Sequence, residues 1–412
     1  MGLLDDARAM APELVALRRA VHQEPEVGLY LPRTQERILE GLEGVPGTTV
    51  TTGRALSSVT AVLRGSRPGP TVLLRADMDA LPLTERADVP YRSRDDSAMH
   101  ACGHDLHTAM LVGAAHLLAA RADRMAGQVV LMFQPGEEGG DGARLMLDEG
   151  VLEAGQAAVP VDGPETSRSL PVAAYALHVS SRHWARGQFA TRPGAVMAAS
   201  DRLVVTVHGT GGHGSAPHHA RNPIPAACAM VGELSGVMVR SLDPMEPVTF
   251  SVGAIHAGTA ANIIPETASF QATVRTFSQD AGDRLAAAVT TLCRGVAEAH
   301  GVTAEVRYLR EYPPTIATPA ESAFAADVAR ELFGEERYEE MRQPLTAAED
   351  FSRVLARVPG TVVQLGATPE GQDHRSAPGN HSPHVVFDDS LVADGAALYA
   401  GLALQRLSEH GN

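Results

Sequence analysis

The chain has 412 residues, of which 44% are hydrophobic and 20% charged, a composition typical of a globular protein. Its formal net charge of -15 at pH 7 argues against a nucleic-acid partner or an anionic membrane surface, because both are negatively charged. Every one of the 34 basic residues is an arginine, which excludes chemistry that needs a lysine amine, such as P-loop phosphate binding and Schiff-base formation.

Cysteine content and hydropathy indicate the compartment. Cys102, Cys228 and Cys293 are far apart and odd in number, which predicts reduced thiols in the cytoplasm. No stretch approaches the roughly 20 apolar residues of a membrane span. The acidic start of the chain lacks the basic and apolar regions of a secretory signal.

Helices and strands alternate in the first part of the chain. Apolar residues with helical spacing predict one N-terminal helix over residues 4–21, and Thr34 is the candidate cap of a second helix that ends near Glu43. Other apolar segments predict a helix at residues 107–122 and strands at residues 58–65, 71–78, 128–135 and 172–179. This order indicates an α/β fold, with a mixed, largely parallel sheet and helices on both of its faces.

The order of elements changes from about Gly187. Six segments then predict the order strand, helix, strand, strand, helix, strand: residues 201–209, 222–240, 248–258, 267–277, 280–301 and 303–312. That order is typical of a ferredoxin-like domain. Because a helix, a strand and a C-terminal helix follow after about Pro314, we expect an insertion: one domain at 1–187 and 314–412, and an inserted domain at 188–313.

Polar residues gather just after the predicted strands. Asp77 and Asp79 follow one strand, Glu137 and Glu138 follow another, and His178 ends a third. In sheets of this kind, ligands bind beyond the carboxyl ends of the strands. Alone, a strand-end histidine or a Glu-Glu pair is more often an ordinary polar group than a functional one.

The segment MHACGHDLHT and the loop GNHSPH add further donors. They contribute Cys102, His104 and His381, whose thiolate and imidazoles suit zinc or another borderline divalent metal. Together with Glu138 and His178, these side chains could hold two metal ions. A free carboxylate beside a ligating one could act as general base toward a water activated by the metals, which points to amide hydrolysis.

Four further residues keep two interpretations each. Asp77 could bind metal or form a salt bridge, and His107 is either structural or a support for a ligand. Glu349 in AEDFS could contact substrate or begin a helix. His384 is a spare ligand or, more simply, a residue at the rim of the site.

Two other enzyme classes fit the sequence less well. Gly209, Gly211 and Gly214 form a G-x-G-x-x-G pattern after a predicted strand, which resembles a dinucleotide fingerprint. Pro217 and Pro223 follow where that fingerprint needs a helix, so we reject nicotinamide binding. The chain has no G-x-S-x-G sequence, so a serine hydrolase of the α/β-hydrolase type lacks its nucleophile turn.

Longer motifs are specific when taken together. The chain contains, in this order, LLRADMDALPLTE, HACGHDLHTAMLVGAA, FQPGEEGGDGARLMLDEGVL, GGHGSAPHHARNPI, GTAANIIPETASFQATVRTF and NHSP. They closely resemble the M20 metallopeptidase and amidohydrolase family, and most of all its hippurate hydrolases, auxin-conjugate hydrolases and N-acyl-amino-acid amidohydrolases. The resemblance covers nearly the whole chain.

The resemblance implies a catalytic domain with a two-metal centre, interrupted by a lid domain that also mediates dimerisation. It assigns metal binding to five residues, with Cys102 as the bridging ligand: Cys102, His104, Glu138, His178 and His381. Glu137 takes the position of the general acid/base, and Asp79 that of an aspartate that orients a ligand. On the lid, His213, Asn262 and Arg275 take positions that bind the substrate carboxylate and the developing oxyanion, with His213 a candidate to reach a partner subunit's site.

We therefore expect a cytoplasmic homodimer with two divalent metal ions per subunit, zinc or manganese, with cobalt or nickel as further candidates. The expected reaction is hydrolysis of small N-acyl or N-aroyl amino acids to a carboxylic acid and a free amino acid. The alternatives are a dipeptidase or carboxypeptidase of the same family and, with less support, a non-catalytic ligand-binding protein.

Overall fold

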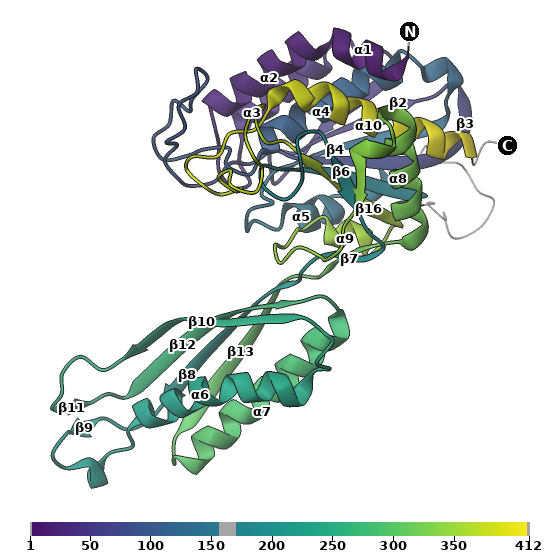
Figure 1. Ribbon diagram of the computed structural model, residues 1–412. Helices are drawn as coiled ribbons and strands as arrows, with labels where there is room; N and C mark the ends of the chain where they lie inside the picture. The colour runs from purple at the N-terminus through teal and green to yellow at the C-terminus, as the bar shows by residue number, and fades with distance from the viewer. Residues whose placement is uncertain (1, 156–169, 410–412) are drawn as a thin grey trace. The chain divides into compact units, whose positions relative to one another are not determined.

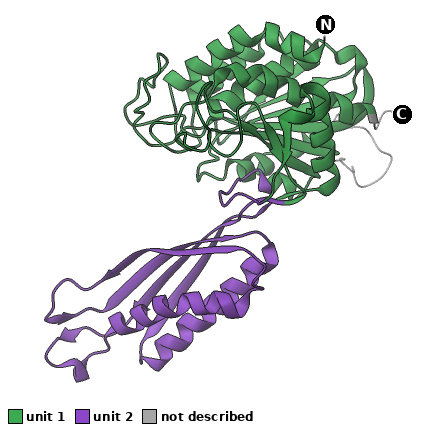
Figure 2. Ribbon diagram, viewed as in Figure 1, with its two compact units in different colours: residues 1–194, 316–342, 353–412 green, residues 195–315, 343–352 purple. Residues whose placement is uncertain are grey.

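The computed structural model describes residues 2–155 and 170–409, which divide into two compact units (Figure 2). Unit 1 comprises Met1–Gly194, Ile316–Arg342 and Arg353–Asn412, and unit 2 comprises Ala195–Thr315 and Gln343–Ser352. The sequence-based boundaries at 187 and 313 lie a few residues earlier. Residues 343–352 belong to unit 2 instead of the first domain, because the Ala198 amide bonds the carbonyl of Leu345.

Unit 1 is built around a mixed sheet with the strand order β1-β2-β4-β3-β5-β16-β6-β15. Its central strands β4, β3, β5 and β16 run parallel, while β1, β2 and β6 pair antiparallel with their inner neighbours. Residues 129–134 of β4 are all buried, as expected for a parallel strand covered on both faces. The strands are β1 Thr48–Thr52, β2 Val59–Arg64, β3 Arg67–Asp77, β4 Ala126–Gln134, β5 Ala173–Ser180, β6 Phe189–Thr191, β15 Tyr338–Glu340 and β16 Gly360–Gly366.

Helices α4 and α10 pack on each other and on β3. Figure 1 shows them with α1, α2 and α3 on one side of the sheet, and the short α5 on the other. α4 is buried from His104 to Leu118 except at His116, because it is enclosed between the sheet and its neighbouring helices. The helices are α1 Leu3–Ala9, α2 Ala11–Gln23, α3 Pro32–Leu42, α4 His104–Ala119, α5 Gly142–Asp148, α8 Pro319–Phe333 and α10 Val392–Glu409. This is the expected α/β fold.

Two expectations about the N-terminal helices were wrong. The single helix over residues 4–21 is two helices, α1 and α2, because Pro12 has no amide hydrogen and fits only the first turn of a new helix. Thr34 does not cap α3 but lies inside it, buried. The carboxylate of Glu26 instead accepts hydrogen bonds from the Thr34 amide and hydroxyl, at 2.9 and 3.0 Å.

Unit 2 contains a four-stranded antiparallel sheet with the order β10-β12-β8-β13 (Figure 1). Helices α6 and α7 pack on the sheet around a core that includes Met230, Phe270 and Leu285. The elements are β8 Ser200–His208, α6 Pro223–Ser241, β10 Val248–Ala257, β12 Thr267–Thr276, α7 Gln279–Ala299 and β13 Thr303–Tyr312. Their order and pairing are those of a ferredoxin-like domain.

The remaining elements are short. β9 Gly212–His213 pairs with β11 Ile263–Ile264 in unit 2, and β7 Gly194–Met197, β14 Thr315–Ala317 and α9 Ser352–Leu355 lie where the chain passes from one unit to the other. Among the helices of the described residues, none is both long and apolar enough to span a bilayer.

The parallel register of unit 1 brings distant residues to one sheet edge. Asp77, the last residue of β3, pairs with Gln134, the last residue of β4. His178 of β5 pairs with Gln364 of β16, near the ends of those strands. The segments that follow β3, β4 and β16 therefore leave the sheet at the same side, the carboxyl ends of the parallel strands. They carry the polar clusters recognised in the sequence.

Candidate metal centre

Cys102 and His104 flank a glycine that turns the chain into α4. Gly103 has a φ of 90°, in the left-handed region that favours glycine. A Cβ at this position would stand 2.3 Å from Val179 Cγ2, so a side chain would collide with the end of β5. The glycine therefore allows Cys102 and His104 to lie close to that strand.

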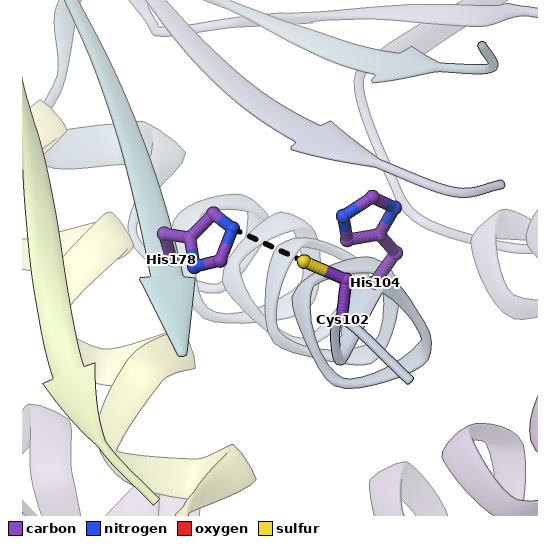
Figure 3. A group of neighbouring side chains, drawn as sticks. All are labelled: Cys102, His104 and His178. Carbon is purple, nitrogen blue, oxygen red and sulfur yellow. Dashed lines mark hydrogen bonds between the residues drawn. The ribbon is translucent and has the colours of Figure 1, made fainter. Parts of the chain in front are cut away.

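The Cys102 thiol lies among the other predicted donors. Its Sγ is 3.6 Å from His178 Nε2 and 3.3 Å from His381 Nε2. His381 Nε2 in turn lies 3.0 Å from Glu138 Oε1. Figure 3 shows the imidazoles of His178 and His104 flanking the thiol. Five groups of possible donor atoms lie within 4.8 Å of one another among the described residues, and three of them combine the residues assigned to this centre: Cys102, His104 and His178; Cys102, Glu138 and His381; and His104, Glu137 and Glu138.

Asp79 fixes the turn that carries both glutamates. Its Oδ1 accepts a hydrogen bond from the Glu137 amide and its Oδ2 one from the Glu138 amide, each at 3.0 Å. Its backbone carbonyl lies 2.9 Å from His104 Nδ1. Asp79 itself is buried. One aspartate thus connects an imidazole donor to the Glu137–Glu138 turn.

Burial and neighbouring charges set the protonation of the cluster. Burial alone would raise the pKa of the Cys102 thiol, but His178 and His104 lower that pKa well below its usual range. Burial lowers the pKa of His104, whereas Asp77 and Cys102 raise it, and the net result lies well above its usual value. Hydrogen bonds to Cys102 and Glu138 raise the pKa of His381 to about 10. These shifts favour the thiolate of Cys102 and the protonated forms of His104 and His381, and a divalent cation would compete with those protons.

Asp77 forms the salt bridge that the sequence left open. Its Oδ2 lies 2.6 Å from Arg75 Nη1, and its Oδ1 lies 2.5 Å from His107 Nδ1. The Val179 amide donates to His107 Nε2 at 2.8 Å. Both nitrogens of His107 are therefore engaged within the protein, and this histidine ties α4 to the end of β5.

Glu349 and His384 have local structural contacts. The Glu349 carboxylate accepts a hydrogen bond from the Phe351 amide at 3.0 Å, just before α9, which is the geometry of a helix start. His384 is exposed, and its amide donates to Ser382 Oγ at 3.2 Å. These contacts fit the structural interpretation of Glu349 and the position of His384 at a rim.

The three lid residues do not lie together within the described unit 2. His213 pairs with Ile263 between β9 and β11, and the Gly214 amide donates to the Asn262 carbonyl at 2.9 Å, so His213 and Asn262 are neighbours. Arg275 lies at the opposite end of β12, eight residues from Thr267, or roughly 26 Å at 3.3 Å per residue. One copy of unit 2 therefore presents Arg275 at one end of β12 and His213 with Asn262 at the other.

Sequence reasoning did not find Asn380, which contacts two other segments of the site. Its only signal was its place directly before His381. Nor did it find the buried ion pair of Arg18 with Asp105, whose partners come from α2 and α4. Neither contact has a local pattern, because each joins residues that are distant in the chain.

The residues present fit a metal. Cys102, His104 and His178 offer one thiolate and two imidazoles, and Glu138 adds a carboxylate, the donors that zinc and similar ions prefer. His104 Nε2 is buried and has no hydrogen-bond partner among the described residues, although its Nδ1 contacts the Asp79 carbonyl. The same Nε2 lies 3.7 Å from Asp77 Oδ2. An imidazole oriented through one nitrogen can bind a metal ion through the other.

Comparison with known proteins decides the family. The model of peptidase family M20/M25/M40 matches residues 73–405. The chain belongs to this M20 family. This M20 protein is 35% identical over 407 residues to thermostable carboxypeptidase 1 of Saccharolobus solfataricus, covering 98% of each chain. It is 33% identical to hippurate hydrolase of Campylobacter jejuni, covering 99% of this chain and 100% of that one.

A solved structure supports the same assignment. A Bacillus subtilis protein, described as a dinuclear metal-binding peptidase from the M20 family, matches with a TM-score of 0.81 at 27% identity, covering 97% of this chain and 99% of that chain. Family, fold and donor cluster agree, so this M20 protein is a metal-dependent hydrolase.

Proposed function

We propose that this M20 protein is an amidohydrolase that cleaves N-acyl or N-aroyl amino acids to a carboxylic acid and a free amino acid. The observation that carries the proposal is the meeting of the Cys102-centred donors with Glu137 at one sheet edge, where Asp79 fixes the glutamate turn. Similarity to a hippurate hydrolase over the whole chain supports an acylated amino acid as substrate.

In this proposal, two divalent ions bind to five side chains, with Cys102 as the shared ligand: Cys102, His104, Glu138, His178 and His381. The central place of the thiol among the other donors supports the shared role. The thiolate and imidazoles favour zinc, and manganese, cobalt and nickel are the alternatives. When bound, the pair supplies Lewis-acid activation of the amide carbonyl and of the attacking water. The dinuclear Bacillus subtilis relative supports the number of ions.

Glu137 is the group that we assign to proton transfer. Its amide is held by Asp79, and its side chain is buried beside His104 and Glu138. The Glu137 carboxylate accepts a proton from water as the new C–O bond forms, and delivers it to the leaving amine nitrogen as the C–N bond breaks.

Replacing Glu137 with glutamine tests this assignment. Glu137→Gln keeps the shape of the side chain but cannot accept the proton, so we expect turnover to fall by about 10²- to 10⁴-fold with metal content unchanged. Metal content is measured by elemental analysis of the same preparation. The matched control Glu43→Gln changes an exposed glutamate and should behave like the wild type. Unchanged turnover in Glu137→Gln contradicts the mechanism.

Arg275, His213 and Asn262 are the proposed substrate-binding residues of unit 2. A guanidinium can grip a carboxylate with two parallel hydrogen bonds, which suits the free carboxylate of an amino acid. Because His213 and Asn262 lie at the other end of β12, we propose that they serve the site of a second subunit in a homodimer formed through unit 2. Sedimentation velocity tests the dimer. The three free cysteines support a cytoplasmic location.

A carboxypeptidase is the second candidate, since the chain is 35% identical to thermostable carboxypeptidase 1. Both reactions cleave an amide whose nitrogen belongs to an amino acid, so the same centre suits either substrate. A panel of N-acetyl, N-benzoyl and longer N-acyl amino acids beside dipeptides, run with several metals, separates them. Higher kcat/KM for the acyl compounds supports the amidohydrolase, and higher kcat/KM for peptides supports the carboxypeptidase.

A further inference from the structure

Asn380 joins three segments of the chain at the candidate metal centre. Its Oδ1 accepts a hydrogen bond from the Ser181 amide at 3.2 Å. Its Nδ2 donates to the Cys102 carbonyl at 3.2 Å and to the Val179 carbonyl at 3.0 Å. The side-chain amide thus contacts backbone groups of two other segments through both its oxygen and its nitrogen, and Nδ2 also lies 3.8 Å from Cys102 Sγ.

Each of these segments carries one proposed metal ligand. Cys102 is contacted directly, and Val179 directly follows His178, whose Nδ1 lies 2.9 Å from the same Val179 carbonyl. Asn380 itself precedes His381. The three ligands are 76 and 203 residues apart in the chain, so no local structure fixes their spacing.

The backbone at His381 needs support from such contacts. His381 has a φ of 68°, in the left-handed region that side chains other than glycine rarely adopt. Its amide donates to the Ala101 carbonyl at 2.8 Å, on the segment that Asn380 also holds through Cys102. Two adjacent residues thus bind the loop to the start of α4, and the loop presents His381 Nε2 to the thiol.

We propose that Asn380 is a positioning residue that sets the spacing of Cys102, His178 and His381 before a divalent cation binds. The inference rests on the proposed metal site and extends it to a residue that contributes through its contacts to the ligand segments. Loss of an outer partner of a metal ligand typically costs about 10- to 100-fold in metal affinity. An aspartate at this position would aim a carboxylate at two carbonyl oxygens and lie near the Cys102 thiol. We therefore expect metal affinity to fall further with aspartate than with alanine.

The test measures Co²⁺ affinity by titration and the melting temperature of the metal-free protein, for Asn380→Ala and Asn380→Asp. We expect affinity to fall about 10- to 100-fold in Asn380→Ala and further in Asn380→Asp, with the metal-free melting temperature close to that of the wild type. The matched control Asn222→Ala removes an asparagine that caps α6 in unit 2, and its Co²⁺ affinity should not change.

The following results would contradict the proposal. Affinity within twofold of the wild type in both variants overturns the proposal, as does an equal loss in Asn222→Ala. If Asn380→Ala does not fold, Asn380→Ser, which keeps a hydrogen-bonding group at this position, carries the test, and loss of the metal-free fold in both assigns Asn380 a general structural role instead. A wild type that binds Co²⁺ yet hydrolyses no acylated amino acid contradicts the proposed function alone, because affinity is read without turnover.

Discussion

His104 and Asp105 are neighbours in the first turn of α4, but they belong to two buried polar clusters of different character. Asp105 lies in the paired cluster, where acids and bases neutralise one another. Its Oδ2 is 2.8 Å from Arg18 Nε and 2.8 Å from His22 Nδ1, and His22 Nε2 is 3.2 Å from Glu85 Oε1. All four side chains are buried.

His104 lies in the open cluster, the donor group around Cys102. There the imidazoles, the thiol and the Glu138 carboxylate converge, with donor atoms within 4.8 Å of one another. The difference teaches how to separate two uses of buried polar groups. Groups that satisfy each other stabilise the fold, whereas donors that face one another around a common centre are suited to an external cation.

The largest expected effect is the loss of folding stability when the paired cluster is broken. Asp105→Ala leaves the buried Arg18 guanidinium without its main partner, which we expect to cost about 3–5 kcal/mol of stability. Thermal and urea unfolding of the metal-free protein measure the loss. The matched control Asp96→Ala breaks an exposed ion pair with Arg92 and should cost at most about 1 kcal/mol. Equal effects in the two variants would remove the distinction between a paired cluster and an ordinary surface pair.

A smaller effect on folding stability is expected from His22, because its contribution depends on its protonation and therefore on pH. Burial and Arg18 lower the pKa of His22, but Asp105 and Glu85 raise it, and the net result lies above its usual value. Because the folded-state pKa is the higher one, protonated His22 stabilises the fold below the unfolded pKa of about 6.5. This contribution is lost as the pH rises through the folded-state pKa.

The stability difference between wild type and His22→Gln should therefore be largest in mildly acidic buffer and shrink as the pH rises. Melting temperatures of both proteins across the neutral and alkaline range measure it, with His384→Gln as the control at an exposed histidine. A difference that grows with pH would show that His22 is neutral in the folded protein.

The sequence was sufficient for features that depend on local pattern. The buried runs of β4 and β5 and the strand-helix order of unit 2 follow from periodicity. That Glu138 and His178 lie at the same end of the sheet follows from their places beside the carboxyl ends of parallel strands, and Cys102 joins them from the segment directly before α4.

Features that depend on contacts between distant residues could not be predicted. Glu26 replaces Thr34 as the group that binds the start of α3, and only the course of the chain between them makes this possible. Arg18 and Asp105 pair across 87 positions, and Asn380 contacts Cys102 across 278. The separation of His213 from Arg275 likewise depends on how far β12 extends, which the motifs do not encode.

The absorption spectrum of the Co²⁺-loaded protein tests the central claim, that the open cluster binds metal through Cys102. We predict a near-ultraviolet charge-transfer band from thiolate to cobalt in the wild type, because Cys102 Sγ lies among the other donors and cysteine binds a metal ion as the thiolate. In Cys102→Ser we predict that this band is lost and that Co²⁺ binds more weakly. A wild type without the band, or a Cys102→Ser variant that keeps it together with full affinity, would contradict the account.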